Sequence, residues 1–215
     1  MTDTIFLEGP VGKMEIYVDY PQGEYTGFAL VCHPHPLVGG TPQHKVPTLL
    51  AQLLLEQGCI VYRPNFRGVG QTAGVHDDGF GETEDMLNLI EQLQQRHGGL
   101  PFYAAGFSFG AHVLANCQAR LSAEHKPRQM ILCGLPTADV AGLRCYDTPA
   151  IQADLLLIHG ELDDVTLLSD LMLWARPQRH LITVLPGANH YFTGYLNQLR
   201  LAISRFLVVR AAKSA

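Results

Sequence analysis

The sequence has no long apolar run, no block of like charge and few cysteines, and each absence excludes a class of protein. No apolar stretch approaches the roughly 18 residues of a membrane-spanning helix, so no membrane segment is expected. The net charge of −5 is small and dispersed, which argues against nucleic acid or an anionic membrane as partner. The five cysteines are odd in number and lack C-x-x-C spacing, so we expect reduced thiols in a cytoplasmic protein. The opening residues, MTDTIFLEGP, lack the basic and apolar segments of a secretory signal, and none is expected.

Short apolar runs alternate along the chain with longer segments of helical spacing. Residues 4–8 and 13–19 predict two antiparallel strands joined across a Gly-Pro turn. Further strands are expected at 28–32, 59–62, 102–107, 130–133, 155–159 and 181–185, and helices at 46–57, 82–97, directly after 107, and at 165–175 and 195–212. This alternation predicts an α/β fold with a mostly parallel, twisted sheet and helices on both faces. With 215 residues, 47% of them hydrophobic, a single domain over 1–215 is the expected organisation.

One stretch carries a catalytic pattern in the context that the pattern requires. Gly106-Phe107-Ser108-Phe109-Gly110 is a G-x-S-x-G sequence between an apolar strand and a run of helical spacing. At such a turn the serine adopts a strained backbone conformation, and the glycines allow strand and helix to approach. We therefore expect the hydroxyl of Ser108 to be presented as a nucleophile at the start of a helix.

Polar residues also follow the later strands of the predicted sheet. Gly160-Glu161-Leu162-Asp163-Asp164 comes after the strand at 155–159, and Pro186-Gly187-Ala188-Asn189-His190 after the last strand. Parallel strands bring their carboxyl ends to one edge, where open α/β sheets bind their ligands. A serine needs an imidazole as base, and the imidazole needs a carboxylate to hold its tautomer. Ser108, then Asp163 or Asp164, then His190 is a candidate Ser-Asp-His triad in that chain order.

Four segments together resemble a known family over nearly the whole chain. They are His33–Gly40 (HPHPLVGG), Asn65–Thr72 (NFRGVGQT), Gly106–Gly110 (GFSFG) and His159–Asp163 (HGELD). The sequence is similar to the α/β-hydrolases, and more narrowly to a small bacterial group of serine hydrolases and esterases without a cap domain. The second segment departs from the pattern, with Gln71-Thr72 where a serine is common. The resemblance implies Asp163 as the triad acid, with Asp164 as the alternative.

The resemblance also implies an oxyanion hole with two backbone donors. One is the N–H of Phe109, directly after the nucleophile, and the other comes from the loop after the strand at 28–32. Pro34 and Pro36 have no N–H, so the second donor is His35 or Leu37. The position of His35, two residues after the strand-end His33, matches the donor of the family.

The predicted connection between the strands at 130–133 and 155–159 is too short for a helical cap. We therefore expect an open, shallow substrate pocket. Its expected lining residues are Leu37, Val38, Phe107, Leu135 and Tyr191. The expected reaction is hydrolysis of a small-molecule carboxylic ester with a small or short acyl group, through an acyl-enzyme.

Several alternatives stay open at this stage. A thioesterase or acyltransferase would use the same triad, and a non-catalytic binding protein could keep the hydrolase fold. His33-x-His35 could belong to a metal site, but no third ligand has a matching spacing, so neither a metal nor a cofactor is expected. A free sheet edge could support a homodimer.

Overall fold

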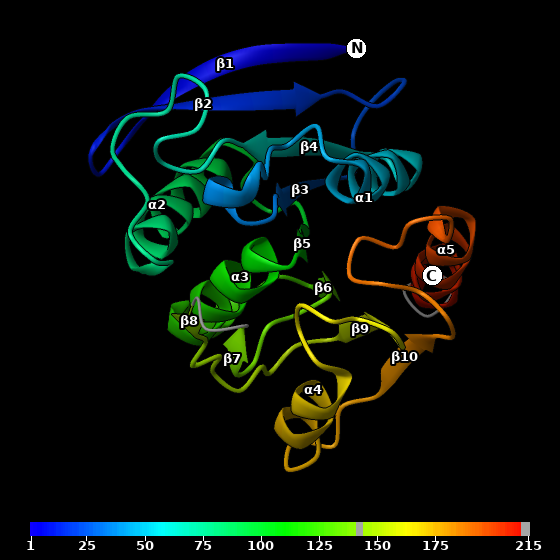
Figure 1. Cartoon of the computed structure of the whole chain (residues 1–215). Coiled ribbons are helices and arrows are strands. Elements are labelled where there is room, and N and C mark those ends of the chain that lie inside the picture. Colours follow the sequence, from blue (N-terminus) through cyan, green and yellow to red (C-terminus); the bar gives the residue numbers. More distant parts are fainter. Residues whose placement is uncertain (141–143, 212–215) are drawn as a thin grey trace.

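The computed structural model describes residues 1–140 and 144–211 around an eight-stranded sheet in the order β1-β2-β4-β3-β5-β6-β9-β10 (Figure 1). Its strands are β1 (Thr2–Gly9), β2 (Gly12–Asp19), β3 (Gly27–Cys32), β4 (Cys59–Pro64), β5 (Phe102–Phe107), β6 (Gln129–Cys133), β9 (Leu155–Gly160) and β10 (Ile182–Leu185). β1 pairs with β2, and β2 with β4, in antiparallel fashion, and all pairings from β4 to β10 are parallel. The expected α/β fold with a mostly parallel sheet is therefore confirmed.

Helices cover both faces of this sheet. Two of them, α1 (Lys45–Glu56) and α5 (Leu196–Ala211), lie on one face, and α2 (Phe80–Arg96), α3 (Phe109–Arg120) and α4 (Leu168–Ala175) lie on the other (Figure 1). Short 3-10 turns η1 (Pro36–Val38) and η2 (Ala123–His125) complete the helical elements of the described residues. Since both faces are covered, every residue of β3 and of β4 is buried, which explains the continuous apolar runs of β3 and of residues 59–62 in β4.

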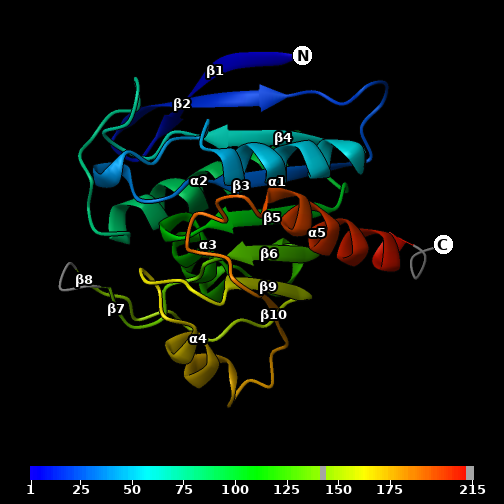
Figure 2. The same ribbon diagram turned by 45° about the vertical axis from the view of Figure 1, so that its right-hand side comes forward.

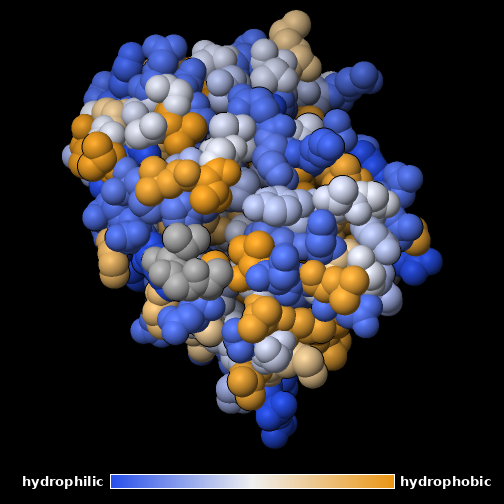
Figure 3. Space-filling model, viewed as in Figure 1, coloured by the Kyte–Doolittle hydropathy of each residue, from blue (hydrophilic) through white to orange (hydrophobic). Residues whose placement is uncertain are grey.

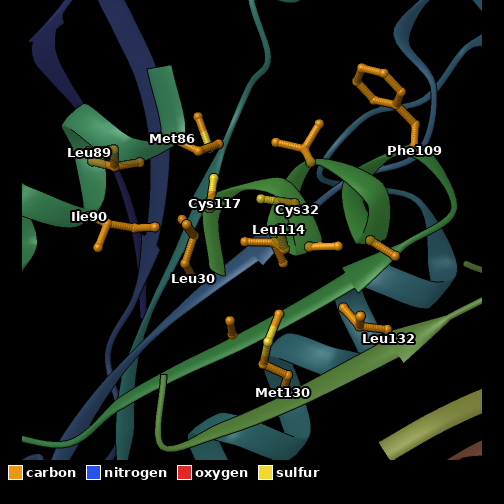
Figure 4. Close-up of a cluster of buried hydrophobic side chains, with 14 of the residues drawn as sticks. Leu30, Cys32, Met86, Leu89, Ile90, Phe109, Leu114, Cys117, Met130 and Leu132 are labelled. Atoms are coloured by element: carbon orange, nitrogen blue, oxygen red, sulfur yellow. The ribbon is translucent and has the colours of Figure 1, made fainter. Parts of the chain in front are cut away.

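The hydrophobic core is divided by the sheet into two clusters. The larger one joins α2, α3 and α4 to one face of the strands, and the smaller one joins α1 and α5 to the other face. Figure 4 shows Met86 and Ile90 of α2 near Cys117 of α3, with Leu30 of β3 beside them. This packing holds α3, and with it the start of the helix after Ser108, firmly against the sheet.

Two local features differ from the sequence-based expectations. The helix expected at 165–175 begins only at Leu168, because the N–H groups of Val165 and Thr166 donate to the carboxylate of Asp163 and hold this segment in a turn. A small hairpin of β7 (Asp139–Val140) and β8 (Arg144–Cys145) occupies the connection before β9. Ala212, the expected end of the last helix, lies outside the described residues.

The parallel strands end at one edge of the molecule, on the left in Figure 2, and β7 and β8 lie beyond that edge. From β3 the chain passes over one face to β4 and then over the other face to β5. β3 and β5 are neighbours, so the connections that leave their carboxyl ends diverge to opposite faces. Such a divergence is where α/β sheets bind their ligands. Across residues 1–140 and 144–211, every helix is too short or too polar to cross a bilayer.

Candidate active site

Ser108 lies in a strained turn between β5 and α3. Its φ of 54° and ψ of −120° belong to a region that side chains other than glycine rarely adopt. A methyl group on Gly106 would lie 2.7 Å from the nitrogen of Ala111, and one on Gly110 would lie 2.5 Å from the carbonyl oxygen of Cys32. Both glycines are therefore required for the helix to start directly beside the strands. The expected nucleophile geometry is present.

His190 lies on the loop after β10 and faces Ser108. Its Nε2 atom is 2.9 Å from Oγ of Ser108, and its Nδ1 atom is 2.8 Å from Oδ2 of Asp163. A carboxylate only accepts hydrogen bonds, so Nδ1 carries the proton and Nε2 accepts from the serine hydroxyl. The ring of Phe107 lies 5.1 Å from the imidazole and supports it. This arrangement is the one in which an imidazole removes the hydroxyl proton of a serine.

Asp163 is buried and fully engaged, whereas Asp164 is exposed. One carboxylate oxygen of Asp163 accepts from the N–H groups of Val165 and Thr166, and the other from the Thr166 hydroxyl and from His190. Burial acts to raise the pKa of Asp163, but the hydrogen bond and electrostatic interaction with His190 and the hydrogen bond from the Thr166 N–H outweigh it, and the pKa is lowered. The carboxylate stays ionised and can stabilise an imidazolium.

Two backbone contacts keep the loops of Asp163 and His190 together. The N–H of Leu162 donates to the carbonyl of Ala188 at 2.9 Å, and the N–H of Gly187 donates to the Glu161 carboxylate at 2.8 Å. Gly160 is close to the same loop, because a methyl group there would lie 2.4 Å from the Ala188 carbonyl oxygen. The distance between acid and base is therefore set by backbone packing as well as by their own hydrogen bond.

Three residues that sequence reasoning did not assign to the site contact its acid and base. Thr166 donates its hydroxyl to Oδ2 of Asp163 at 3.0 Å, and the buried His159 lies 2.7 Å from the Thr166 carbonyl oxygen. Gly134, after β6, lies against His190. His159 is part of the HGELD segment, so its motif offered a signal, whereas Thr166 and Gly134 belong to no pattern in the sequence.

Backbone N–H groups of two loops point to an oxyanion site near Ser108. Among residues 1–140 and 144–211, the N–H groups of Phe109 and His35 have no hydrogen-bond acceptor. The N–H of Leu37, the alternative donor, is occupied by Nδ1 of His35 at 3.2 Å. The rings of His35 and Phe109 are 5.0 Å apart, so the two loops are adjacent. This geometry favours His35 over Leu37.

The residues expected to line the pocket divide into two groups. Leu37, Val38 and Tyr191 are exposed to 73%, 65% and 47%. Phe107 and Leu135 are only 0% and 1% exposed, so they support the site from the interior and present no surface to a ligand. Leu135 belongs to the larger hydrophobic cluster, and Phe107, the last residue of β5, belongs to the smaller one. Figure 3 shows apolar and polar residues interspersed on the molecular face seen in Figure 1.

Both ring nitrogens of His33 and the Nδ1 atom of His35 lie within hydrogen-bonding distance of backbone groups. Nδ1 of His33 is 2.7 Å from the Pro34 carbonyl oxygen, its Nε2 atom is 3.0 Å from the nitrogen of Phe66, and Nδ1 of His35 accepts from Leu37. No three His, Cys, Asp or Glu side chains of the described parts of the chain are grouped as metal ligands. The His33-x-His35 pair therefore has a structural role in this loop.

The chain is similar to several known proteins. Residues 43–141 match the sequence profile of a family described as "Serine aminopeptidase, S33". An uncharacterized protein of Rickettsia prowazekii is 37% identical over 110 residues, which are 51% of this chain and 46% of that protein. The chain thus spans about half the length of this curated relative.

Two solved structures are similar over nearly their whole length. An α/β serine hydrolase without lid from Xanthomonas campestris is 31% identical, with a TM-score of 0.84 over 96% of this chain and 93% of that one. An α/β serine hydrolase homologue from Coxiella burnetii is 32% identical, with a TM-score of 0.83 over 95% of this chain and 97% of that one. From this identity, this coverage and the shared sheet, the chain belongs to the α/β serine hydrolases.

Proposed function

We propose that this protein hydrolyses carboxylic esters with small or short acyl groups through an acyl-serine intermediate. The observation that carries the proposal is the continuous hydrogen-bond chain from Ser108 through His190 to Asp163, with distances of 2.9 and 2.8 Å. A hydroxyl paired with a neutral imidazole that is itself held by a buried carboxylate is an activated nucleophile.

The first half of the proposed reaction forms the acyl-enzyme. Oγ of Ser108 bonds to the ester carbonyl carbon while Nε2 of His190 takes the hydroxyl proton. The carbonyl oxygen becomes an oxyanion, and the N–H groups of Phe109 and His35 stabilise it. His190 then gives the proton to the leaving alkoxide, the C–O bond to the alcohol breaks, and Asp163 stabilises the transient imidazolium.

The second half repeats these steps with water. His190 removes a proton from water as the oxygen attacks the acyl carbon, and the proton then returns to Oγ of Ser108 as the acyl bond breaks. The products are a carboxylic acid, an alcohol and the unchanged protein. The preference for short acyl groups follows from the short connection between β6 and β9, which holds a small hairpin in its described part, and from the exposure of Leu37 and Val38.

A fluorophosphonate probe tests this proposal directly. After reaction, mass spectrometry should find one adduct on Ser108 in the unchanged protein, and p-nitrophenyl butyrate should be turned over. Ser108→Ala and His190→Ala should lose both properties, whereas Ser169→Ala, a change at an exposed serine of α4, should keep both. Absence of adduct and of turnover in the unchanged protein would favour a binding protein instead.

The same experiment separates the related reactions. Acyl-coenzyme A, an acceptor alcohol and an aminoacyl p-nitroanilide would be offered beside the ester. Faster turnover of the thioester, or transfer to the alcohol in place of water, would replace the proposed esterase with a thioesterase or acyltransferase, and faster release of nitroaniline would indicate a peptidase.

A further inference from the structure

His33 connects the loop after β3 to the loop after β4. The side chain is fully buried at the end of β3, and its ring packs 4.4 Å from the ring of Phe66. Its Nδ1 atom lies 2.7 Å from the carbonyl oxygen of Pro34, and its Nε2 atom lies 3.0 Å from the backbone nitrogen of Phe66. One ring nitrogen therefore contacts a backbone group that can only accept a hydrogen bond, and the other contacts a backbone group that can only donate one.

These contacts determine which nitrogen of His33 carries the proton. A carbonyl oxygen can only accept, so Nδ1 must donate to Pro34, and a backbone N–H can only donate, so Nε2 must accept from Phe66. Burial, the largest influence, lowers the pKa of His33 to about 4, so the ring is neutral at neutral pH. The ring is a fixed neutral tautomer with both nitrogens in use.

The carbonyl group that His33 holds belongs to the peptide bond between Pro34 and His35. A trans peptide is planar, and its C=O and N–H groups point in opposite directions. All described peptide bonds are trans. When His33 fixes the Pro34 carbonyl on one side, it also fixes the direction of the His35 N–H on the other side.

We propose that His33 is a positioning residue for the oxyanion hole, which aims the His35 N–H at the oxyanion by holding the Pro34 carbonyl. This proposal rests on the proposed function, because it assigns His33 a role in that same reaction. A hydrogen bond to the carbonyl also polarises the peptide and makes its N–H a better donor.

The rest of the loop holds the other side of His35 in the same way. The carbonyl of His35 accepts from the N–H of Gly40 at 3.0 Å and of Val38 at 3.3 Å. Gly40 packs tightly behind the Pro34 carbonyl, since a methyl group there would lie 2.1 Å from that oxygen. Both peptide planes that flank His35 are thus fixed. Its own N–H has no acceptor among the described residues and can donate to a ligand.

Two substitutions separate the two hydrogen bonds of His33. Asparagine places an amide N–H near the position of Nδ1 and can still donate to Pro34, whereas glutamine places an amide oxygen near Nε2 and can accept from Phe66 only. Loss of a well-aimed oxyanion donor costs about 100-fold in kcat, so His33→Gln should lower kcat by that order with little change in KM. His33→Asn should retain most of the activity, and His125→Gln, at an exposed histidine, all of it.

A thionoester supplies a readout that general loosening of the fold would not change. Sulfur is a poorer hydrogen-bond acceptor than oxygen, so a working oxyanion hole prefers the ester to the thionoester. His33→Gln should reduce this preference, and His33→Asn should keep it. Equal loss in the two variants, full activity of His33→Gln, or an unchanged preference would each overturn the proposal. If the unchanged protein has no esterase activity, the proposed function itself fails.

Nitrogen NMR of the unchanged protein tests the hydrogen bond even if a variant does not fold. Histidine labelled with 15N should show His33 as a neutral ring with the proton on Nδ1 from pH 8 down to pH 5. A proton on Nε2, or a cationic ring at neutral pH, would contradict the proposal.

Discussion

Gly134 leaves little room for a side chain beside the imidazole of His190: a methyl group on this glycine would lie 3.2 Å from Cε1 and 3.3 Å from Nδ1 of the ring. Gly134 follows β6 with a φ of 57°, and its N–H donates to the carbonyl of Ile158 at 2.9 Å. The backbone at this point is fixed by the sheet, so an added side chain would have to displace the ring.

Gly134→Ala should therefore reduce catalysis more than stability. The ring must move by a few tenths of an ångström, and a displacement of about 1 Å can cost about 100-fold in rate, so we expect a smaller kcat loss, of about 10-fold, with KM nearly unchanged. Gly99→Ala is the matched control, because Gly99 also has a positive φ, of 83°, but open space around it. Both variants lose about 1 kcal/mol of stability from backbone strain. Steady-state kinetics measure this difference. An equal loss of kcat in the two variants would show that backbone strain, and not displacement of His190, causes the loss.

The Thr166 hydroxyl should contribute to the function of Asp163. Thr166→Val keeps the shape of the side chain and both backbone hydrogen bonds but removes the donor at 3.0 Å from Oδ2. Hydrogen bonds to charged groups contribute about 1.5–3 kcal/mol, so kcat/KM should fall about 10- to 100-fold. Thr166→Ser should restore the activity, whereas activity kept in Thr166→Val but lost in Thr166→Ser would point to the methyl group instead.

Acyl-chain preference should follow from the exposed border of the site. Leu37, Val38 and Tyr191 are exposed, so a longer acyl chain bound against them stays in contact with water and gains little burial. We expect kcat/KM for p-nitrophenyl acetate and butyrate to exceed that for the decanoate and laurate, measured below their critical micelle concentrations. A steady increase with chain length would mean that an apolar groove accommodates the acyl chain.

Burial of His33 should make the protein less stable in mild acid. In the unfolded chain this ring binds a proton near its ordinary pKa of 6.5, but in the native state only near about 4. Between these pH values the unfolded state carries more protons, so the free energy of unfolding falls as the pH falls, by up to about 3 kcal/mol from this group. Above pH 6.5 both states are neutral and His33 has no effect.

Urea unfolding at several pH values measures this contribution. The asparagine in His33→Asn does not titrate, so the free energy of unfolding of this variant should fall less steeply as the pH is lowered. Part of the fall should remain, because burial also lowers the pKa of His112 to about 4. His125→Asn, at an exposed position, should leave the slope as it is. A slope in His33→Asn equal to that of the unchanged protein would contradict the assignment.

Sequence patterns alone determined the sheet, the helices and the residues that face each other at its edge. The alternation of apolar runs and helical spacing predicted the sheet, because strands covered on both faces must be apolar throughout. The G-x-S-x-G pattern predicted the turn at Ser108 because only glycine permits the contacts of Gly106 and Gly110 with neighbouring backbone. Local steric constraints and hydrophobic periodicity depend on residues that are close in the sequence, so they can be recognised without a structure.

Tertiary structure alone decided the contacts that join distant segments. Thr166 donates a hydrogen bond to Asp163, and α4 begins only after this turn. Gly134 lies next to the imidazole of His190, and His33 accepts a hydrogen bond from the N–H of Phe66. Phe107 and Leu135 were expected at the ligand surface, but packing from both faces of the sheet buries them. Each of these outcomes depends on which loops the sheet order places side by side, and a single residue carries no local signal of its distant neighbour.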